Sequence, residues 1–109
     1  MAFDENLAAS IRKALARKKG IEEKKMFGGL GFLLNGNMCV GVWKNSMVVR
    51  LGPDEGEAAL FEPHVGEFDI TGRAMAGWVM VAAEGVADEA AVQAWVKRAI
   101  KFVGKLLAK

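Results

Sequence analysis

The sequence predicts a single α+β domain of two layers, with helices on one side of an antiparallel sheet. Two segments, near the two ends of the chain, repeat apolar residues with the period of an amphipathic helix. The middle of the chain holds short apolar runs separated by Gly, Asn and Pro, which is typical of strands. The connections are short, and this favours antiparallel neighbours. A length of 109 residues suits one self-sufficient core.

The first helix is expected to begin after Asp4, which can act as its N-cap, and to end before Gly20. Its apolar positions follow one helical face: Leu7, Ile11, Ala14 and Leu15. Ile21–Lys25 is expected to be a charged connector. A three-stranded meander should follow, with Asn35-Gly36 and Lys44-Asn45-Ser46 as its turns, over Met26–Leu34, Met38–Trp43 and Met47–Leu51.

The uncharged segment Met26–Trp43 is eighteen residues long, which is the lower limit for a membrane-spanning helix. Five glycines each disfavour a helix there by about 1 kcal/mol, and Asn35-Gly36 in the middle favours a hairpin. We therefore expect two strands and no membrane partner. The first residues also lack the pattern of a secretory signal, so we expect a cytoplasmic protein.

The second half of the chain predicts a short helix, two strands and a long last helix. The short helix should open at Gly52-Pro53-Asp54 and run to about Phe61. The strands are expected at Glu67–Thr71 and Trp78–Ala83. Asp88 should cap the last helix, whose apolar stripe continues to Leu106 and Leu107. The predicted order is α-β-β-β-α-β-β-α.

The residues offer little catalytic or metal-binding chemistry. With one cysteine, Cys39, and one histidine, His64, the chain can form no internal disulfide and no four-ligand zinc site. We expect Cys39 to be a buried thiol of high pKa and His64 to be an exposed loop residue. The glycine-rich run 28–31 is followed by a strand rather than by a helix N-terminus, which argues against a phosphate loop. We therefore expect no cofactor, no metal and no enzymatic activity.

Charged residues give two further candidate sites. Arg50, on the strand face opposite Met47 and Val49, could hold an anion, although pairing with an acidic residue is favoured. Arg73, in a loop, is a possible partner contact or an ordinary exposed charge. The last thirteen residues carry five Lys/Arg and no acid, as the helix dipole prefers. They also raise the alternative of weak, salt-sensitive nucleic-acid binding, through Lys97, Arg98, Lys101 and Lys105.

Four segments, in order, resemble the N-terminal domain of TfoX (Sxy) proteins over about residues 20–105. They are Met26–Phe32 with the Asn35-Gly36 turn, Val49-Arg50-Leu51, Met75–Trp78 and Ala94–Ala99. The motif residues, with a structural or partner-binding role, are Phe27, Gly28, Gly29, Gly31, Gly36, Arg50, Met75, Gly77 and Trp78.

This resemblance implies an α+β fold like that of secretion chaperones and a role connected with transcriptional control of natural competence. Longer members of the family carry an additional C-terminal helical domain, so the chain resembles a short, standalone member. We expect a non-catalytic regulatory module that binds a protein partner. The alternatives are direct nucleic-acid binding through the basic helix ends, and a small-ligand-binding protein or enzyme that uses the region of Arg50 and Arg73.

Self-association is the last expectation. If helices cover one face of the sheet, the other face must be polar or must meet another molecule. The strand segments Met38–Trp43 and Trp78–Ala83 contain no charge, so their outward side chains are apolar. We expect a homodimer that buries them, with Val48 as one outward position. The methionines on these strands could serve such a surface or fill the core.

Overall fold

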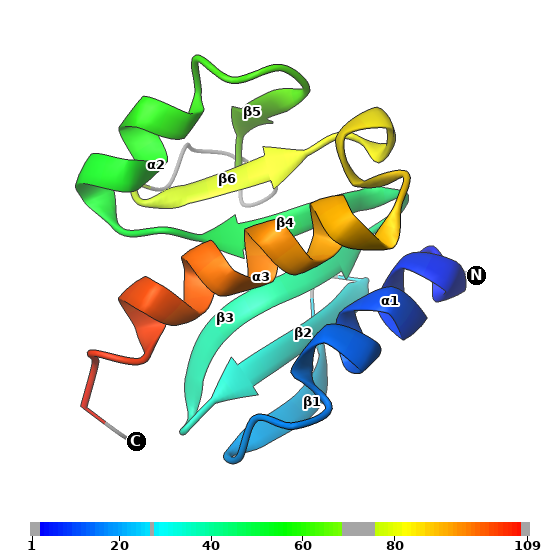
Figure 1. Cartoon of the computed structure of the whole chain (residues 1–109), viewed down its shortest axis with the longest axis vertical. Helices are drawn as coiled ribbons and strands as arrows, with labels where there is room; N and C mark the ends of the chain where they lie inside the picture. The colour runs from blue at the N-terminus through cyan, green and yellow to red at the C-terminus, as the bar shows by residue number, and fades with distance from the viewer. Residues whose placement is uncertain (1–2, 27, 69–75, 108–109) are drawn as a thin grey trace.

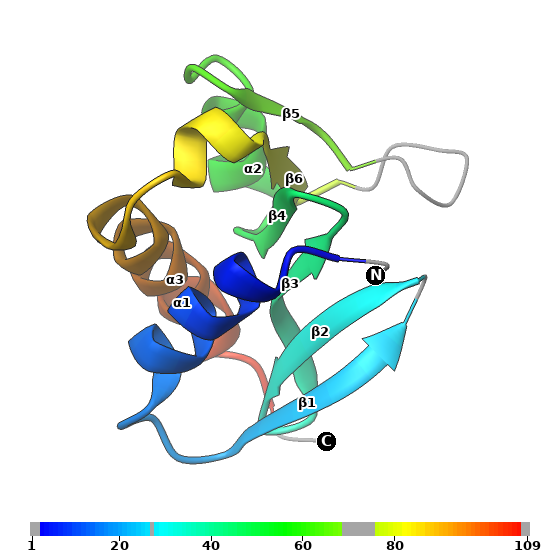
Figure 2. The ribbon, with the colours of Figure 1, turned by 90° about the vertical axis from the view of Figure 1, so that its right-hand side faces the viewer.

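The computed structural model describes residues 3–26, 28–68 and 76–107 of the chain. Its elements are α1 (Glu5–Leu15), β1 (Ile21–Met26), β2 (Gly29–Leu34), β3 (Asn37–Trp43), β4 (Ser46–Arg50), α2 (Pro53–Ala59), β5 (Val65–Glu67), β6 (Trp78–Val81), the 3-10 helix η1 (Ala83–Val86) and α3 (Glu89–Val103). The strands form one antiparallel sheet in the order β1-β2-β3-β4-β6-β5. α1 and α3 lie beside each other across one face of it (Figures 1 and 2). The predicted α+β class is confirmed.

Both long helices begin where the sequence predicts. The Asp4 carboxylate accepts hydrogen bonds from the backbone N–H groups of Asn6 at 2.8 Å and Leu7 at 3.1 Å. The Asp88 carboxylate accepts from the N–H of Ala91 at 2.8 Å. Each cap satisfies backbone donors that have no partner inside the helix.

Both helices end earlier than expected. α1 ends at Leu15, and Gly20, with φ 84°, turns the chain into β1 while its carbonyl accepts from Asn35 N–H at 2.8 Å. α3 ends at Val103, and the Asn37 side chain donates to the carbonyl of Leu107 at 2.8 Å. In both places hydrogen bonds to the sheet compete with another helical turn.

The charged segment Ile21–Lys25 is not a connector but most of β1, an edge strand of the sheet. It pairs with β2 along its whole length, from Ile21 opposite Leu34 to Met26 opposite Gly29. Its four central side chains are all exposed: Glu22, Glu23, Lys24 and Lys25. This pairing depends on backbone hydrogen bonds. The charged side chains protect the edge from other strands. Because the segment lacks alternating apolar residues, its sequence did not indicate a strand.

The tight turn, α2 and β6 lie where the sequence predicts, and β5 does not. Asn35 and Gly36 have φ of 53° and 85°, as the expected tight hairpin turn requires. α2 ends at Ala59 rather than near Phe61. β5 lies earlier in the chain than predicted, at Val65–Glu67. Of the predicted strand Glu67–Thr71, only Glu67 belongs to β5, Phe68 lies outside any strand, and residues 69–71 are outside the described part. β6 ends at Val81 because η1 begins at Ala83.

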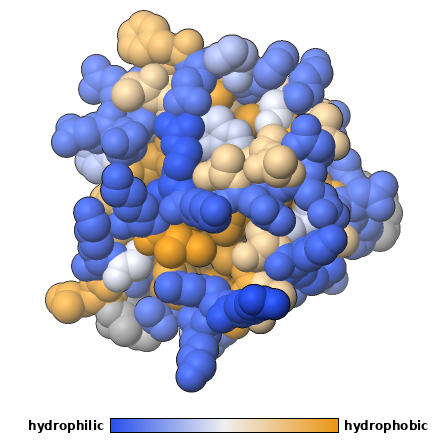
Figure 3. Space-filling view, in the orientation of Figure 1, coloured by the Kyte–Doolittle hydropathy of each residue, from blue (hydrophilic) through white to orange (hydrophobic). Residues whose placement is uncertain are grey.

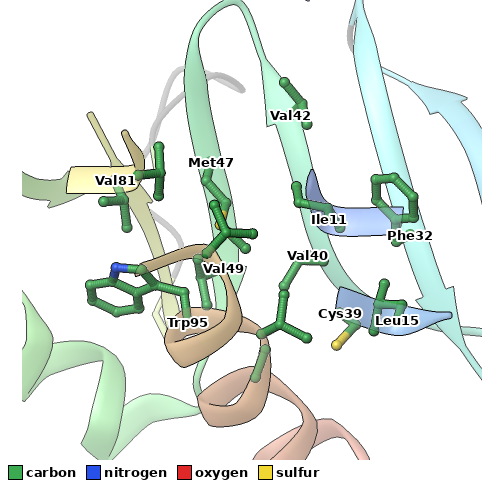
Figure 4. Packing of buried hydrophobic residues seen from close by; sticks show 14 of the residues in the cluster. Ile11, Leu15, Phe32, Cys39, Val40, Val42, Met47, Val49, Val81 and Trp95 are labelled. Carbon is green, nitrogen blue, oxygen red and sulfur yellow. The ribbon is translucent and has the colours of Figure 1, made fainter. Parts of the chain in front are cut away.

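The core lies between the helices and the sheet (Figure 4). Ile11 and Leu15 of α1 lie beside Phe32 and Val40 of the sheet in this view. Alternate residues of the strands face the helices, including Val40, Val42, Met47, Val49, Val79 and Val81. Phe32 pairs with Val40 and Leu33 pairs with Met38. Cys39 therefore has no partner on β2 and forms a bulge in β3.

Three glycines join α2 to β6. The Gly77 carbonyl accepts from the N–H groups of Leu51 at 2.8 Å and Gly52 at 3.2 Å. Gly52 and Gly77 both have φ of 88°, a conformation that favours glycine. A Cβ atom on Gly56 would lie 2.8 Å from Gly77 Cα. The first turn of α2 therefore packs directly on the backbone that enters β6.

This contact predicts that Gly56→Ala destabilises the protein, although Gly→Ala inside a helix ordinarily stabilises it by about 1 kcal/mol. The new methyl group would collide with backbone rather than with a movable side chain. We expect a loss of about 1–3 kcal/mol in the free energy of unfolding, measured with urea.

The matched control is Gly66→Ala on β5, where an added Cβ has nothing within 4 Å. Its free energy of unfolding should change by no more than about 0.5 kcal/mol. A Gly56→Ala protein that is as stable as wild type would contradict the close packing of α2 on Gly77.

Candidate functional site

Within residues 3–26, 28–68 and 76–107, no helix covers one face of the sheet, and this face holds a band of large apolar side chains. Because alternate strand residues face the core, their neighbours point to this uncovered face. Five of them, from β2, β3 and β6, are partly exposed: Leu33, Met38, Trp43, Trp78 and Met80. We call them the apolar band. The methionines are divided between the two faces, since Met47 is buried in the core while Met38 and Met80 belong to the band.

Val48 lies on the uncovered face, as expected, but it is not an outward position. It pairs with Gly41 and Met80 on the neighbouring strands and is only 4% exposed. The expectation of an exposed Val48 is therefore wrong. Gly41, which lies beside Val48, has no side chain, so larger neighbours can occupy the space above it. The Met38 side chain lies 3.0 Å from a Cβ built on Gly41.

Arg50 ends β4 among aromatic rings. Its guanidinium carbon lies 5.2 Å from the centroid of the Trp78 ring and 5.7 Å from that of Phe102, within cation–π range. One guanidinium nitrogen donates to the Met38 carbonyl at 3.4 Å. Phe68, which is buried, stacks on Trp78 with the ring centroids 5.6 Å apart. Within the described residues Arg50 contacts rings and a carbonyl, and not one of the carboxylates that the sequence led us to expect.

The family-motif residues fall into two groups. Arg50, Gly77 and Trp78 meet at the β4–β6 junction, where Arg50 pairs with Trp78 and Gly77 accepts two hydrogen bonds. The others lie along the β1–β2–β3 hairpins: Gly28 with φ 77° in the first turn, Gly36 in the second, and Gly29 and Gly31 within β2. A Cβ on Gly29 would collide with the Val42 carbonyl, so this glycine is required for strand packing. Phe27, Arg73 and Met75 lie outside the described residues.

Cys39 and His64 are placed as the sequence predicts. Cys39 is buried, and this burial raises the pKa of its thiol to about 11, so it is protonated at neutral pH. His64 is exposed in the turn before β5, with φ 66°. Neither residue lines any of the three grooves described next.

Two grooves flank α2, and a smaller one lies beside α1. The α2–α3 groove has a volume of about 430 Å³ and is lined by Leu51, Glu55, Arg98, Lys101, Phe102 and Lys105. The α2–β6 groove, of about 350 Å³, is lined by Pro53, Gly56, Glu57, Leu60, Glu67, Ala76, Gly77 and Trp78. Phe61, which follows Leu60, is 89% exposed. The third, of about 160 Å³, lies at the start of α1.

The basic side chains at the end of α3 are of two kinds: Arg98 is held by an ion pair, and the lysines are exposed to solvent. Both terminal nitrogens of Arg98 donate to the Glu62 carboxylate, at 3.0 and 2.8 Å, and its guanidinium carbon lies 4.4 Å from the Trp95 ring centroid. Hydrogen bonding to Glu62 raises the pKa of Arg98, and the same bonds lower the pKa of Glu62. Lys97, Lys101 and Lys105 are exposed. Sequence reasoning missed Glu62, because nothing in the spacing links residues 62 and 98.

The described residues contain no group of three or more His, Cys, Asp or Glu side chains that could hold a metal ion. In the same part of the chain, no helix combines the length and the apolar character needed to cross a bilayer.

The burial of Cys39 predicts slow reaction with thiol reagents. At a pH of about 8 the native protein should react with Ellman's reagent at least tenfold more slowly than the unfolded protein, because little thiolate is present and the sulfur is covered. The rate should be followed by absorbance, with the protein in denaturant as the reference. Equal rates in the native and unfolded states would mean that Cys39 is accessible.

The Arg98–Glu62 pair predicts a pH-dependent contribution to stability. Because the pKa of Glu62 is lowered in the folded state, the stabilisation is present above the unfolded pKa and is lost as the pH falls through the folded one. A double-mutant cycle with Arg98→Gln and Glu62→Gln should give a coupling of about 0.2–1 kcal/mol at about pH 7, since both side chains are partly exposed. A coupling that is zero at neutral pH, or unchanged at about pH 3, contradicts this assignment.

Comparison with known proteins agrees with the motifs. A protein-family model, the TfoX N-terminal domain, matches residues 13–103. The match therefore runs from within α1 to the end of α3 and covers every strand of the sheet. No curated protein and no solved structure gives a significant match. The chain belongs to the TfoX N-terminal domain family.

Proposed function

We propose that this protein is a non-catalytic interaction module of gene regulation, which self-associates and binds other proteins through the uncovered face of its sheet. The observation that carries the proposal is the apolar band, in which five large side chains from three strands remain partly exposed. Contiguous apolar surface on a sheet face is typical of an interaction site.

A two-fold dimer is the simplest way to cover such a face. The same band on two copies is self-complementary in a symmetric pair. Aromatic and methionine side chains are enriched at protein interfaces because they bury a large area and adapt in shape. Trp43, Trp78, Met38 and Met80 supply this chemistry from one side of the sheet.

The same proposal includes that the protein is non-catalytic. It is supported by the placement of the side chains that could act as nucleophiles or bases. The Cys39 thiol is buried and protonated at neutral pH. His64 and the serines Ser10 and Ser46 lie on separate elements: the turn before β5, α1 and β4. Nucleophilic catalysis needs such a group within hydrogen-bond reach of a base.

Membership of the TfoX N-terminal domain family supports a regulatory role, which we place in the control of natural competence. The same proposal places the protein in the cytoplasm, where a reducing environment keeps the single thiol free.

Substitutions in the band test self-association. We expect light scattering to give about twice the 11.7 kDa chain mass for the wild type at high micromolar concentration. Leu33→Glu, and as a second variant Met80→Glu, should give the monomer mass, because a carboxylate in the buried interface would lose its hydration. Both variants should keep a cooperative unfolding transition, as neither side chain is in the core.

The control is Phe61→Glu, which adds the same charge at an exposed apolar residue that follows α2 and belongs to no strand of the sheet. It should leave the mass at twice the chain value. A wild-type mass that stays near 11.7 kDa, or dissociation by Phe61→Glu alone, would contradict a dimer through the apolar band.

Binding of other proteins is tested by affinity capture from native lysate, with and without nuclease, read by mass spectrometry. Proteins held through the band should be captured by wild type and by Phe61→Glu but not by Leu33→Glu. If the wild type captures proteins only when nuclease is left out, direct nucleic-acid binding is favoured instead.

A further inference from the structure

The α2–α3 groove combines an apolar floor with basic walls. Leu51, which is buried, and Phe102, which is partly buried, form the apolar part. The Phe102 ring packs against Gly52, since a Cβ there would lie 2.5 Å from a ring carbon. Arg98, Lys101 and Phe102 have the three- and four-residue spacing of a single helix face. This arrangement differs from an ordinary solvated lysine face, because the charges border a hollow with an apolar base.

The positive charges of the groove are not equally available. Arg98 is held by two hydrogen bonds to Glu62 and lies beside Trp95. Lys101 and Lys105 are exposed, and within the described residues neither has a carboxylate oxygen within 4.0 Å. Glu55 lines the opposite wall. Lys101 and Lys105 therefore present their ammonium groups to solvent next to the apolar floor. The Arg98 guanidinium mainly holds α3 to the segment that follows α2, through Glu62.

We propose that the α2–α3 groove binds an acidic peptide segment of a protein partner, with an apolar side chain of that segment against Leu51 and Phe102 and its carboxylates on Lys101 and Lys105. This inference rests on the proposed function as an interaction module, and it assigns a second surface, distinct from the apolar band, to the partner. The charge of the groove complements such a segment, and its volume suits one or two anchoring side chains.

The same groove is poorly suited to nucleic acid. Glu55 lines the groove, so a continuous run of backbone phosphates would pass a carboxylate, whereas a short peptide can place its carboxylates on Lys101 and Lys105 alone. Trp95 is buried and faces Arg98, and the Phe102 ring has Gly52 and Arg50 beside it. The part of Phe102 that lines the groove remains for contact with one apolar side chain. Base stacking needs an open ring face. A peptide fits both the charges and the floor.

The probe is a library of random peptides displayed on phage, selected on wild-type protein with the Lys101→Glu/Lys105→Glu variant as the counter-selection. We expect enrichment of sequences in which Asp or Glu flanks a Leu, Ile or Phe. A synthetic peptide of the enriched sequence, labelled with fluorescein, should bind wild type at least tenfold more tightly than Lys101→Glu/Lys105→Glu in fluorescence anisotropy.

The matched control is Lys24→Glu/Lys25→Glu on β1, which changes the net charge equally at exposed positions of another element. It should weaken peptide binding less than twofold. Replacing the apolar residue of the peptide by serine should cost at least fivefold, since charge attraction alone would then remain.

Three results would overturn the inference: no enrichment over the unselected library, equal loss in the control variant, or tighter binding of a duplex oligonucleotide than of the peptide at the same salt concentration. None of them bears on the apolar band, so the dimer and capture experiments with Leu33→Glu still decide the proposed function separately.

Discussion

The contact between Gly52, Gly56 and Gly77 brings the first turn of α2 onto the backbone at the start of β6, with no side chain between them. One carbonyl, that of Gly77, accepts hydrogen bonds from both residues that leave β4. The position of α2 therefore depends on three residues without a Cβ. Because α2 forms a wall of both the α2–α3 and the α2–β6 grooves, this contact also decides whether those grooves exist.

The two faces of the sheet differ in what covers them. On the helix side, apolar side chains of α1, α3 and the strands fill one continuous core. The surface over the helices is mainly hydrophilic, with an apolar area between α1 and α3 (Figure 3). On the other side, the apolar band remains partly exposed. Arg50 connects the two regions that we assign to binding, since its guanidinium lies near Trp78 of the band and near Phe102 of the α2–α3 groove.

Local signals in the sequence gave correct predictions wherever the determining contact is near in the chain. Asp4 and Asp88 cap helices through hydrogen bonds two or three residues away, and Asn35-Gly36 forms a turn by its own conformational preference. The strand β1 was missed because its pairing with β2 depends on backbone groups, which charged side chains do not reveal. Val48 was assigned to the correct face, yet alternation could not show that Gly41, Met80 and the rest of the face bury it.

Composition, periodicity and short motifs were enough to predict the α+β class, the starts of the long helices, the family, and the placement of Cys39 as a buried residue and His64 as an exposed one. The partners of Arg50, the Arg98–Glu62 pair and the α2–α3 groove became visible only in the folded chain. The physical reason is separation along the chain. Residues 62 and 98, or 52 and 102, meet because α2 and α3 lie at the same end of the sheet, and no local pattern encodes that meeting.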